Sequence, residues 1–218
     1  GACCKGSVGV PRRMYELGVR MMTLTWNHEN ELASPQRNPG GVLVPQTEKG
    51  LTGKGFEFLA EMERMHMIVD VSHLSDKGFW DIARHGTRPF AASHSNCRAL
   101  APHTRNLTDE MIRALSERGG IAGLNYYAPF LDADPTHPEN CRSTVELIAK
   151  HAAHYKQVGG AQMIALGSDF DGIDGPHQLE NAAFLPLLAD ALRKEGFTED
   201  EVEEVYFRNA MRFFEDNL

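Results

Sequence analysis

The sequence predicts an α/β protein built around a parallel β-sheet. Five short, almost continuously apolar runs alternate with segments whose apolar residues recur at helical spacing. Strands that are apolar at nearly every position are typical of a parallel sheet, because helices cover both of its faces. The alternation indicates repeated βα units. No low-complexity segment, charge block or linker divides the 218 residues, so we expect a single domain over residues 1–218.

The predicted strands lie at residues 21–25, 67–71, 89–92, 121–125 and 163–166. After the first strand comes the longest irregular stretch, from Trp26 to about Leu51, which contains Pro35, Pro39, Gly40, Gly41 and Pro45. A loop of this length in a compact domain usually serves a function. Because α/β barrels keep their active-site loops directly after strands, we expect a functional loop here. The alternative is an exposed surface loop that takes no part in catalysis or binding.

The segments between the strands carry helix signals. Phe56, Leu59 and Ala60 form an apolar stripe that predicts one helix. The other helices are delimited by side chains that cap the first turn and by glycines that end the last. These signals are Ser75 with Gly86, Thr108 with Gly119–Gly120, and capping boxes at Ser143–Glu146 and Thr198–Glu201.

Composition excludes several classes of protein. Twenty-two basic against thirty acidic residues give a net charge of −8, which argues against a nucleic-acid or anionic-membrane partner. No run approaches the ~18 consecutive apolar residues of a membrane span. The four cysteines have no zinc-finger spacing and no disulfide-framework density, and residues 1–6 lack signal-peptide features. We therefore expect reduced thiols and a cytoplasmic location, with disulfide use in a secreted protein as the alternative.

Polar side chains follow three of the predicted strands. His73 closes the segment Asp70-Val71-Ser72-His73, His94 lies in Ser93-His94-Ser95, and Asp169 follows the fifth strand. Because parallel strands end at the same edge of a sheet, we expect these three side chains to converge. Imidazole and carboxylate groups together suit zinc and similar divalent ions. The sequence therefore predicts a metal site at this edge.

Further candidates lie near these strand ends. His28 directly follows the first strand and is a loop histidine that we keep as a site candidate. Arg105 suits a substrate with a carboxylate, because its planar guanidinium can bind both oxygens. The alternative for Arg105 is an exposed arginine ahead of a helix. His151 and His154, three residues apart in one helix, are expected on a solvated face.

In their order along the chain, these motifs resemble the membrane (renal) dipeptidase family. The resemblance rests on Tyr15–Arg20 leading into Thr23–Thr25, then on Asp70–His73, Ser93–Ser95, Arg105–Asn106 and Gly167–Gly172. Members are zinc dipeptidases of the amidohydrolase type on a (β/α)8 barrel. The resemblance implies that this chain forms the carboxyl-terminal part of such a barrel, about five βα units. It also implies hydrolysis of dipeptides, with two zinc ions bridged by a glutamate.

The same resemblance assigns roles to residues of this chain. It implies that His73 and His94 bind the second zinc ion and that Asp169 is the catalytic acid and base. Arg105 then holds the substrate carboxylate, and Tyr127 lines the pocket.

The loop after the first strand departs from the family pattern. Where the best-known members carry a substrate-polarising histidine, this chain has Trp26, followed by Asn27 and His28. Either Asn27 or His28 is expected to take the place of that histidine, and the sequence leaves the choice open.

Two further features of the family are not found in residues 1–218: the His-x-Asp metal motif of the first barrel strand, and the bridging glutamate. We therefore expect an amino-terminally truncated member that binds one zinc ion or none and has little activity. The alternative is a catalytically inactive remnant that serves as a structural or weak metal-binding unit. Hydrolysis of a cyclic amide is a further alternative, which Arg105 disfavours. The unpaired edges of a partial barrel also predict a homo-oligomer.

Overall fold

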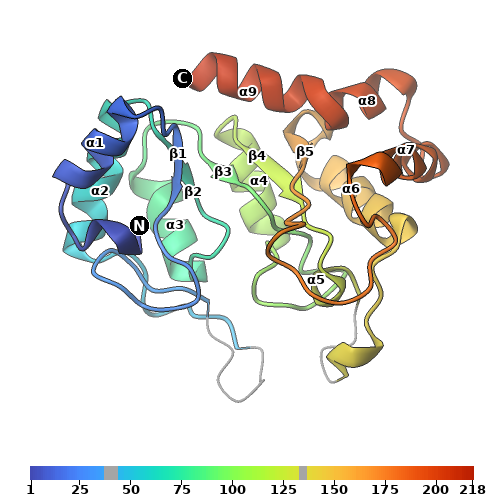
Figure 1. Ribbon diagram of the computed structural model, residues 1–218, viewed down its shortest axis with the longest axis horizontal. Coiled ribbons are helices and arrows are strands. Elements are labelled where there is room, and N and C mark those ends of the chain that lie inside the picture. Colours follow the sequence, from blue (N-terminus) through green and yellow to red (C-terminus); the bar gives the residue numbers. More distant parts are fainter. Residues whose placement is uncertain (37–43, 133–136) are drawn as a thin grey trace. The chain divides into compact units, whose positions relative to one another are not determined.

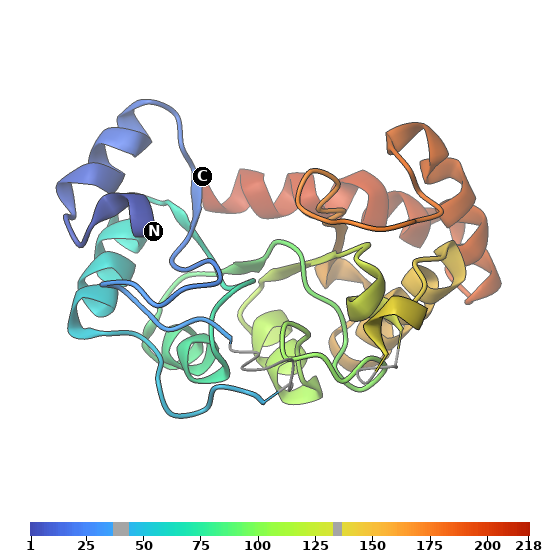
Figure 2. The same ribbon diagram turned by 60° about the horizontal axis from the view of Figure 1, so that its bottom comes forward.

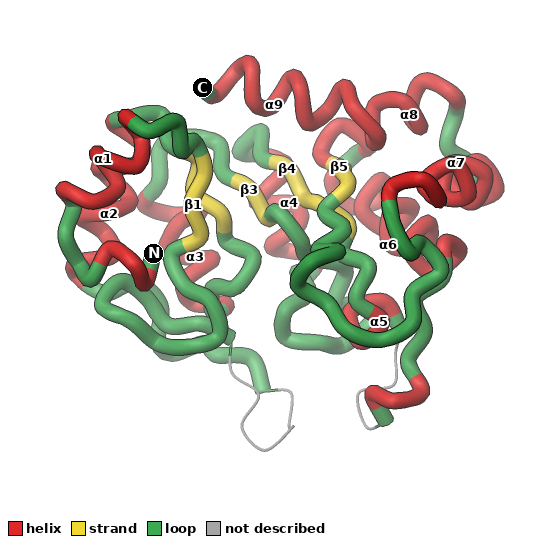
Figure 3. Tube along the Cα trace, viewed as in Figure 1, coloured by secondary structure: helices red, strands yellow, loops and turns green. Residues whose placement is uncertain are grey.

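The computed structural model describes residues 1–36, 44–132 and 137–218, and it contains all five predicted strands. These are β1 (Met21–Thr23), β2 (Ile68–Asp70), β3 (Ala91–Ala92), β4 (Ile121–Leu124) and β5 (Ile164–Leu166) (Figure 1). Strand order in the sheet follows chain order, and β1 with β2, β2 with β3, and β4 with β5 pair in parallel. Helical segments follow every strand (Figure 3). The predicted α/β class, a series of parallel βα units, is confirmed.

The chain groups into two compact units, residues 1–91 with 214–218 and residues 92–213, and each is described by itself. The single domain expected over residues 1–218 stays a prediction.

Within the described residues, no helix is both long enough and apolar enough to cross a membrane. All four cysteines are free thiols. Of the long loop predicted after β1, Pro39, Gly40 and Gly41 lie outside the described residues.

The first unit holds β1, β2 and three α-helices, α1 (Gly9–Glu16), α2 (Gly53–Arg64) and α3 (Asp76–His85), with a short turn η1 at Ala2–Cys4. Helix α3 occupies the predicted place because the Ser75 Oγ accepts a hydrogen bond from the Gly78 N–H at 2.9 Å. Helix α1 lies beside α2 (Figures 1 and 2), and there the Arg12 Nε donates to Glu61 Oε1 at 2.6 Å. The buried side chains of this unit include Phe58, Met62, Ile68, Phe79, Ile82 and Phe90.

The second unit holds β4, β5 and the remaining helices. Its α-helices are α4 (Asp109–Glu117), α5 (Ala128–Leu131), α6 (Val145–Gly159), α7 (Leu185–Lys194), α8 (Glu199–Glu203) and α9 (Asn209–Asn217), the last of which continues past residue 213. The shorter helical segments are η3 (Pro138–Asn140), η4 (Ala161–Met163), η5 (Ala182–Phe184) and the π-helical turn η6 (Glu204–Arg208). The long α6 has the most buried face, with Ile148, Ala149, His151, Ala152 and Tyr155 all inside.

Helix caps in this unit follow the predictions with one correction. Thr108 caps α4, and Thr198 forms the expected capping box with Glu201 at the start of α8. The box predicted at Ser143 is wrong by one residue, because the Ser143 Oγ donates to the Tyr126 carbonyl at 2.6 Å. Thr144 caps α6 instead, and its Oγ1 accepts from the Leu147 N–H at 3.3 Å.

Two glycines let the ends of β4 and β5 approach the segment that follows β3. A Cβ atom on Gly123 would lie 2.0 Å from the Ser93 carbonyl oxygen, and one on Gly167 would lie 2.1 Å from the same atom. No side chain fits at such distances, so only glycine permits this packing. The close approach places the end of β5 and the backbone next to His94 in one small region.

Candidate active site

The predicted site residues are divided between the two units. Asn27, His28 and His73 belong to the first unit. His94, Arg105, Tyr127 and Asp169 belong to the second. The convergence of His73 with His94 and Asp169 therefore stays a prediction.

Asp169 lies directly after β5 in an uncommon backbone conformation. Its φ angle is +62°, in the left-handed region that is uncommon for residues other than glycine, although asparagine and aspartate adopt it more often than most. The turn is closed by the Gly172 N–H, which donates to the Asp169 carbonyl at 2.9 Å. Backbone strain of this kind clusters at functional sites, where the surrounding structure maintains it.

A buried side-chain amide contacts the Asp169 carboxylate. The Asn125 Nδ2 donates to Asp169 Oδ2 at 3.1 Å, and Asn125 is fully buried. On its other side, the Asn125 Oδ1 accepts from the Tyr127 N–H at 2.6 Å. One asparagine thus joins the proposed acid and base to the residue predicted to line the pocket.

Two more buried asparagines continue this network. The Asn96 Oδ1 accepts from the Asn125 N–H at 2.9 Å, and the Asn96 Nδ2 donates to the Asn125 carbonyl at 2.9 Å. The Asn106 Oδ1 in turn accepts from the Asn96 N–H at 3.1 Å. Sequence analysis assigned no role to these asparagines, because an asparagine outside a strand or helix is equally typical of a turn. Their only sequence signal is that each lies within two residues of a candidate site residue, His94, Arg105 or Tyr127.

Arg105 is buried, not exposed as its alternative interpretation required, with 8% of its surface accessible. Its guanidinium carbon lies 5.4 Å from the centre of the Phe130 ring. Burial lowers the pKa of the neighbouring His103 to about 4, and the charges of Arg105 and then Arg98 add to this effect. His103 is therefore neutral near pH 7, and its Nδ1 accepts from the Arg105 N–H at 3.1 Å.

Both histidines predicted to bind metal have their Nδ1 atom engaged. The His73 Nδ1 lies 3.1 Å from the Asn27 Oδ1, which can only accept, so this nitrogen carries the proton. The His94 Nδ1 lies 2.7 Å from the Ser93 Oγ. Such contacts fix the orientation and tautomer of metal-binding histidines, so His73 would bind a metal through Nε2.

The loop after β1 distinguishes Asn27 from His28. Asn27 contacts His73 through its side-chain oxygen. His28 is exposed, and its ring lies 6.4 Å from the Trp26 ring, which also lies 6.4 Å from the His73 ring. Asn27 is therefore placed to orient His73.

The solvated face predicted for His151 and His154 is wrong. His151 is 1% exposed; its Nδ1 accepts from the Cys97 N–H at 3.0 Å and its Nε2 donates to the Leu131 carbonyl at 3.1 Å. Burial lowers the pKa of His151 to about 4, so the ring is neutral. His154 pairs with Asp109 at 2.7 Å. Both are structural contacts of α6.

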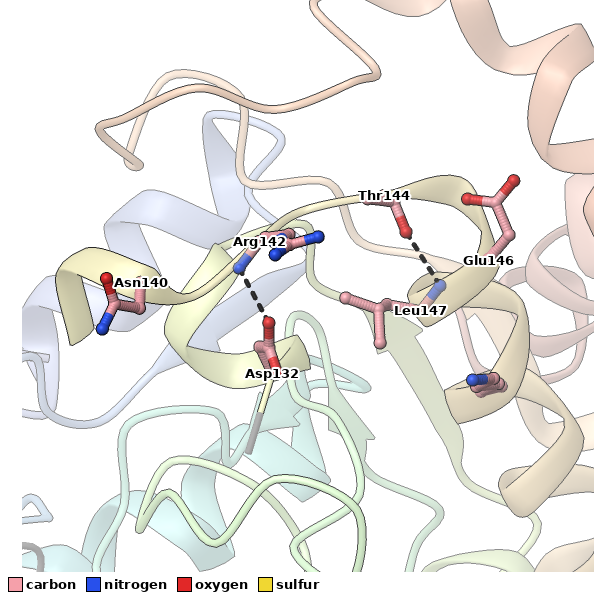
Figure 4. Close-up of a pocket in the computed structure, with 7 residues that line it drawn as sticks. Asp132, Asn140, Arg142, Thr144, Glu146 and Leu147 are labelled. Carbon is pink, nitrogen blue, oxygen red and sulfur yellow. Dashed lines mark hydrogen bonds between the residues drawn. The ribbon is translucent and has the colours of Figure 1, made fainter. Parts of the chain in front are cut away.

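Among the described residues, no group of three or more histidine, cysteine, aspartate or glutamate side chains is arranged to hold a metal ion. The chemical types of the predicted donors do fit zinc, because imidazole and carboxylate groups are typical zinc ligands. A separate open pocket of about 480 Å³ lies at the start of α6 (Figure 4). Its lining is Asp132, Asn140, Arg142, Thr144, Glu146, Leu147 and Lys150, and none of these is a predicted site residue.

Parallel βα units with polar side chains after the strands define this chain as part of a (β/α)8-type barrel, a class that builds its active sites at the carboxyl ends of the strands. Comparison with known families gives the particular assignment. Residues 1–217 match the model of the membrane dipeptidase family, peptidase family M19, and the chain belongs to this family.

Individual relatives agree with the family. The chain is 38% identical over 200 residues to an uncharacterized protein encoded in the pqqA 5' region of Klebsiella pneumoniae, covering 91% of this chain and 72% of that protein. It is 34% identical over 208 residues to an uncharacterized dipeptidase of Schizosaccharomyces pombe, covering 94% of this chain and 48% of that protein.

A solved structure shows the same fold. The metallopeptidase of Rhodobacter sphaeroides, crystallised with a phosphinate mimic of the dipeptide L-Ala-D-Ala, superposes with a TM-score of 0.89 at 31% identity. The match covers 98% of this chain and 60% of the solved one. The chain thus spans about half the length of the fission yeast dipeptidase and about three fifths of the solved metallopeptidase.

Proposed function

We propose that this chain carries out metal-dependent hydrolysis of dipeptides. The observation that carries the proposal is the family match over residues 1–217, because it contains every motif to which a role is assigned. Buried Arg105 and the oriented rings of His73 and His94 support it. The substrate class follows from Arg105, since a fixed guanidinium that binds the terminal carboxylate favours short peptides.

In the proposed reaction, His73 and His94 would hold zinc, His73 through its Nε2 atom. Zinc, when bound, would supply polarisation of the peptide carbonyl and a water of lowered pKa. Asp169 would take a proton from the attacking water as its oxygen bonds to the carbonyl carbon, and would deliver a proton to the leaving amine nitrogen as the C–N bond breaks. Arg105 fixes the free carboxylate of the substrate, and Tyr127 closes one side of the pocket. Asn27 acts on His73, so it is the residue of the β1 loop to which we assign a role.

We further propose that residues 1–218 alone hold zinc weakly, because a zinc site usually has at least three protein ligands. Elemental analysis after dialysis, combined with an assay of L-Ala-D-Ala hydrolysis, tests both parts. Turnover that depends on added zinc supports the proposal. Absence of both zinc and turnover under all loading conditions would favour an inactive, structural role. Two tightly held zinc ions would contradict weak binding.

A substitution tests the substrate class. Arg105→Lys keeps the positive charge but loses the planar guanidinium that can bind both oxygens of a carboxylate. We therefore expect KM for L-Ala-D-Ala to rise by about tenfold, with a smaller change in kcat. Arg113→Lys is the matched control, since Arg113 is exposed on α4 of the same unit. Equal KM values for the two variants would show that Arg105 does not bind the substrate.

A further inference from the structure

We propose that Asn125 is a positioning residue that holds the Asp169 carboxylate in the orientation required for proton transfer. The inference rests on the proposed function, in which Asp169 is the acid and base. It goes beyond that function, because Asn125 takes no direct part in the proposed reaction.

The orientation of the Asn125 amide is determined by its two partners. The Tyr127 N–H can only donate, so the atom that it contacts at 2.6 Å must be the Asn125 oxygen. The amide nitrogen therefore faces Asp169, and its N–H donates to Oδ2 at 3.1 Å. A hydrogen bond to a carboxylate is stronger than one between neutral groups.

The backbone of Asn125 is held just as firmly. Asn96 binds both its N–H and its carbonyl oxygen, each at 2.9 Å. The Asn106 Nδ2 and the Asn96 Nδ2 both donate to the Phe130 carbonyl, at 2.9 and 3.2 Å. All three asparagines are fully buried. Asn125 is thus held in one position, and its side-chain hydrogen bond can hold a second side chain in place.

The conformation of Asp169 makes such a contact important. Its backbone lies in the left-handed region at φ +62°, a conformation that is uncommon for residues other than glycine. A Cβ atom on Gly172 would lie 2.3 Å from Asp169 Oδ1, so this carboxylate oxygen is close against the turn. The turn locates Oδ1 and Asn125 locates Oδ2, and together they set the plane of the carboxylate.

The first test is kinetic. Asn125→Asp keeps the acceptor for the Tyr127 N–H and replaces the donor to Asp169 by an oxygen. We expect kcat for L-Ala-D-Ala, per folded and zinc-loaded protein, to fall by tenfold to about a hundredfold, with KM changed less than about threefold. Asn209→Asp is the matched control: Asn209 is fully buried in the same unit, and its Nδ2 donates to the Ala161 and Ile164 carbonyls at 2.8 and 2.9 Å. Both variants lose stability, but only the first should lose kcat.

The second test does not depend on activity. The side-chain amide resonance of Asn125 is followed by NMR in the 218-residue chain and in Asp169→Asn, which keeps a residue that tolerates the left-handed region. We expect the Asn125 resonance to move and the Asn209 resonance to stay. An unmoved Asn125 resonance, or equal kcat in N125D and N209D, would overturn the inference. An unmodified chain without turnover would instead overturn the proposed function, and the NMR result would still decide the role of Asn125.

Discussion

The candidate site residues of the two units are held in different ways. In the first unit, His73 is oriented by Asn27 beside Trp26, whose side chain is 63% exposed. In the second unit, Asp169 and Tyr127 are joined by Asn125 in a network of fully buried amides. Water competes for the exposed Asn27–His73 contact more readily than for the contacts of the buried Asn125 side chain, so we expect a lost partner to cost more in the second unit. The Asp169 carboxylate is thus contacted by a buried amide, and the His73 ring by an exposed one.

The largest expected effect concerns the backbone packing of the second unit. In Gly123→Ala the new Cβ would lie 2.0 Å from the Ser93 carbonyl oxygen, and neither backbone can yield without moving a strand. We expect the free energy of unfolding in urea to fall by about 3 kcal/mol or more. Gly53→Ala is the control in the first unit, because a Cβ there meets nothing within 4 Å, and it should be neutral or slightly stabilising. Similar losses for both variants would contradict the close approach.

The second expected effect is a pH dependence that arises from His151. Its pKa is about 4 in the folded protein, mainly because of burial, and near 6.5 when unfolded. The unfolded state therefore binds more protons between these values, and stability is complete above pH 6.5 and falls as the pH drops toward 4. We expect a loss of about 2 kcal/mol between pH 7 and pH 5 from this residue.

Urea unfolding of the parent chain and of His151→Gln at both pH values isolates this contribution. The variant should be less stable at pH 7, because the Cys97 N–H and the Leu131 carbonyl lose well-placed partners. Its stability should also depend less on pH than that of the parent by the amount assigned to His151. Parallel pH profiles would show that His151 does not titrate as its burial requires.

The burial of His151 also illustrates a limit of prediction from sequence. The strands, the caps at Ser75, Thr108 and Thr198 and the parallel pairing were predictable, because apolar runs and capping side chains act on their own neighbours. Helical spacing placed His151 and His154 on one face but does not reveal whether another element covers that face. Burial is a property of the tertiary structure, and the same limit applies to Arg105.

The asparagine network was not predictable for a related reason. Asn96, Asn106 and Asn125 lie 10 and 19 residues apart along the chain, and nothing in their local sequence indicates that their side chains meet. Each is individually typical of a turn. The tertiary structure brings them together. The strand ends that carry candidate site residues were therefore predictable, whereas the buried amides that contact Asp169 and one another were not.

The third expected effect tests the exposed contact of the first unit. Asn27→Ala removes the acceptor of the His73 Nδ1 proton, and we expect zinc affinity to fall by about tenfold or more, since partners of metal-binding histidines have effects of this size. Competition with a chromophoric chelator measures the affinity. His28→Ala is the control from the same loop and should change the affinity less. If His28→Ala had the larger effect, the role that we assign to Asn27 would pass to His28.

The last comparison takes one helix cap from each unit. The Ser75 Oγ accepts from the Gly78 N–H at 2.9 Å and donates to the Lys49 carbonyl at 2.6 Å, and Ser75 is fully buried. The Thr198 Oγ1 accepts from the Glu201 N–H at 3.2 Å at an exposed helix start. In Thr198→Ala, water can replace the lost acceptor, so we expect a loss of about 0.5–1 kcal/mol in urea unfolding. In Ser75→Ala, the buried Gly78 N–H and the half-buried Lys49 carbonyl both lose their partner, and the loss should reach about 2 kcal/mol. The first unit thus contains buried polar contacts too, and what distinguishes the units is the environment of the candidate site residues. Equal losses for the two caps would mean that burial does not set the cost of these contacts, and the contrast drawn between Asn27 and Asn125 would lose its physical basis.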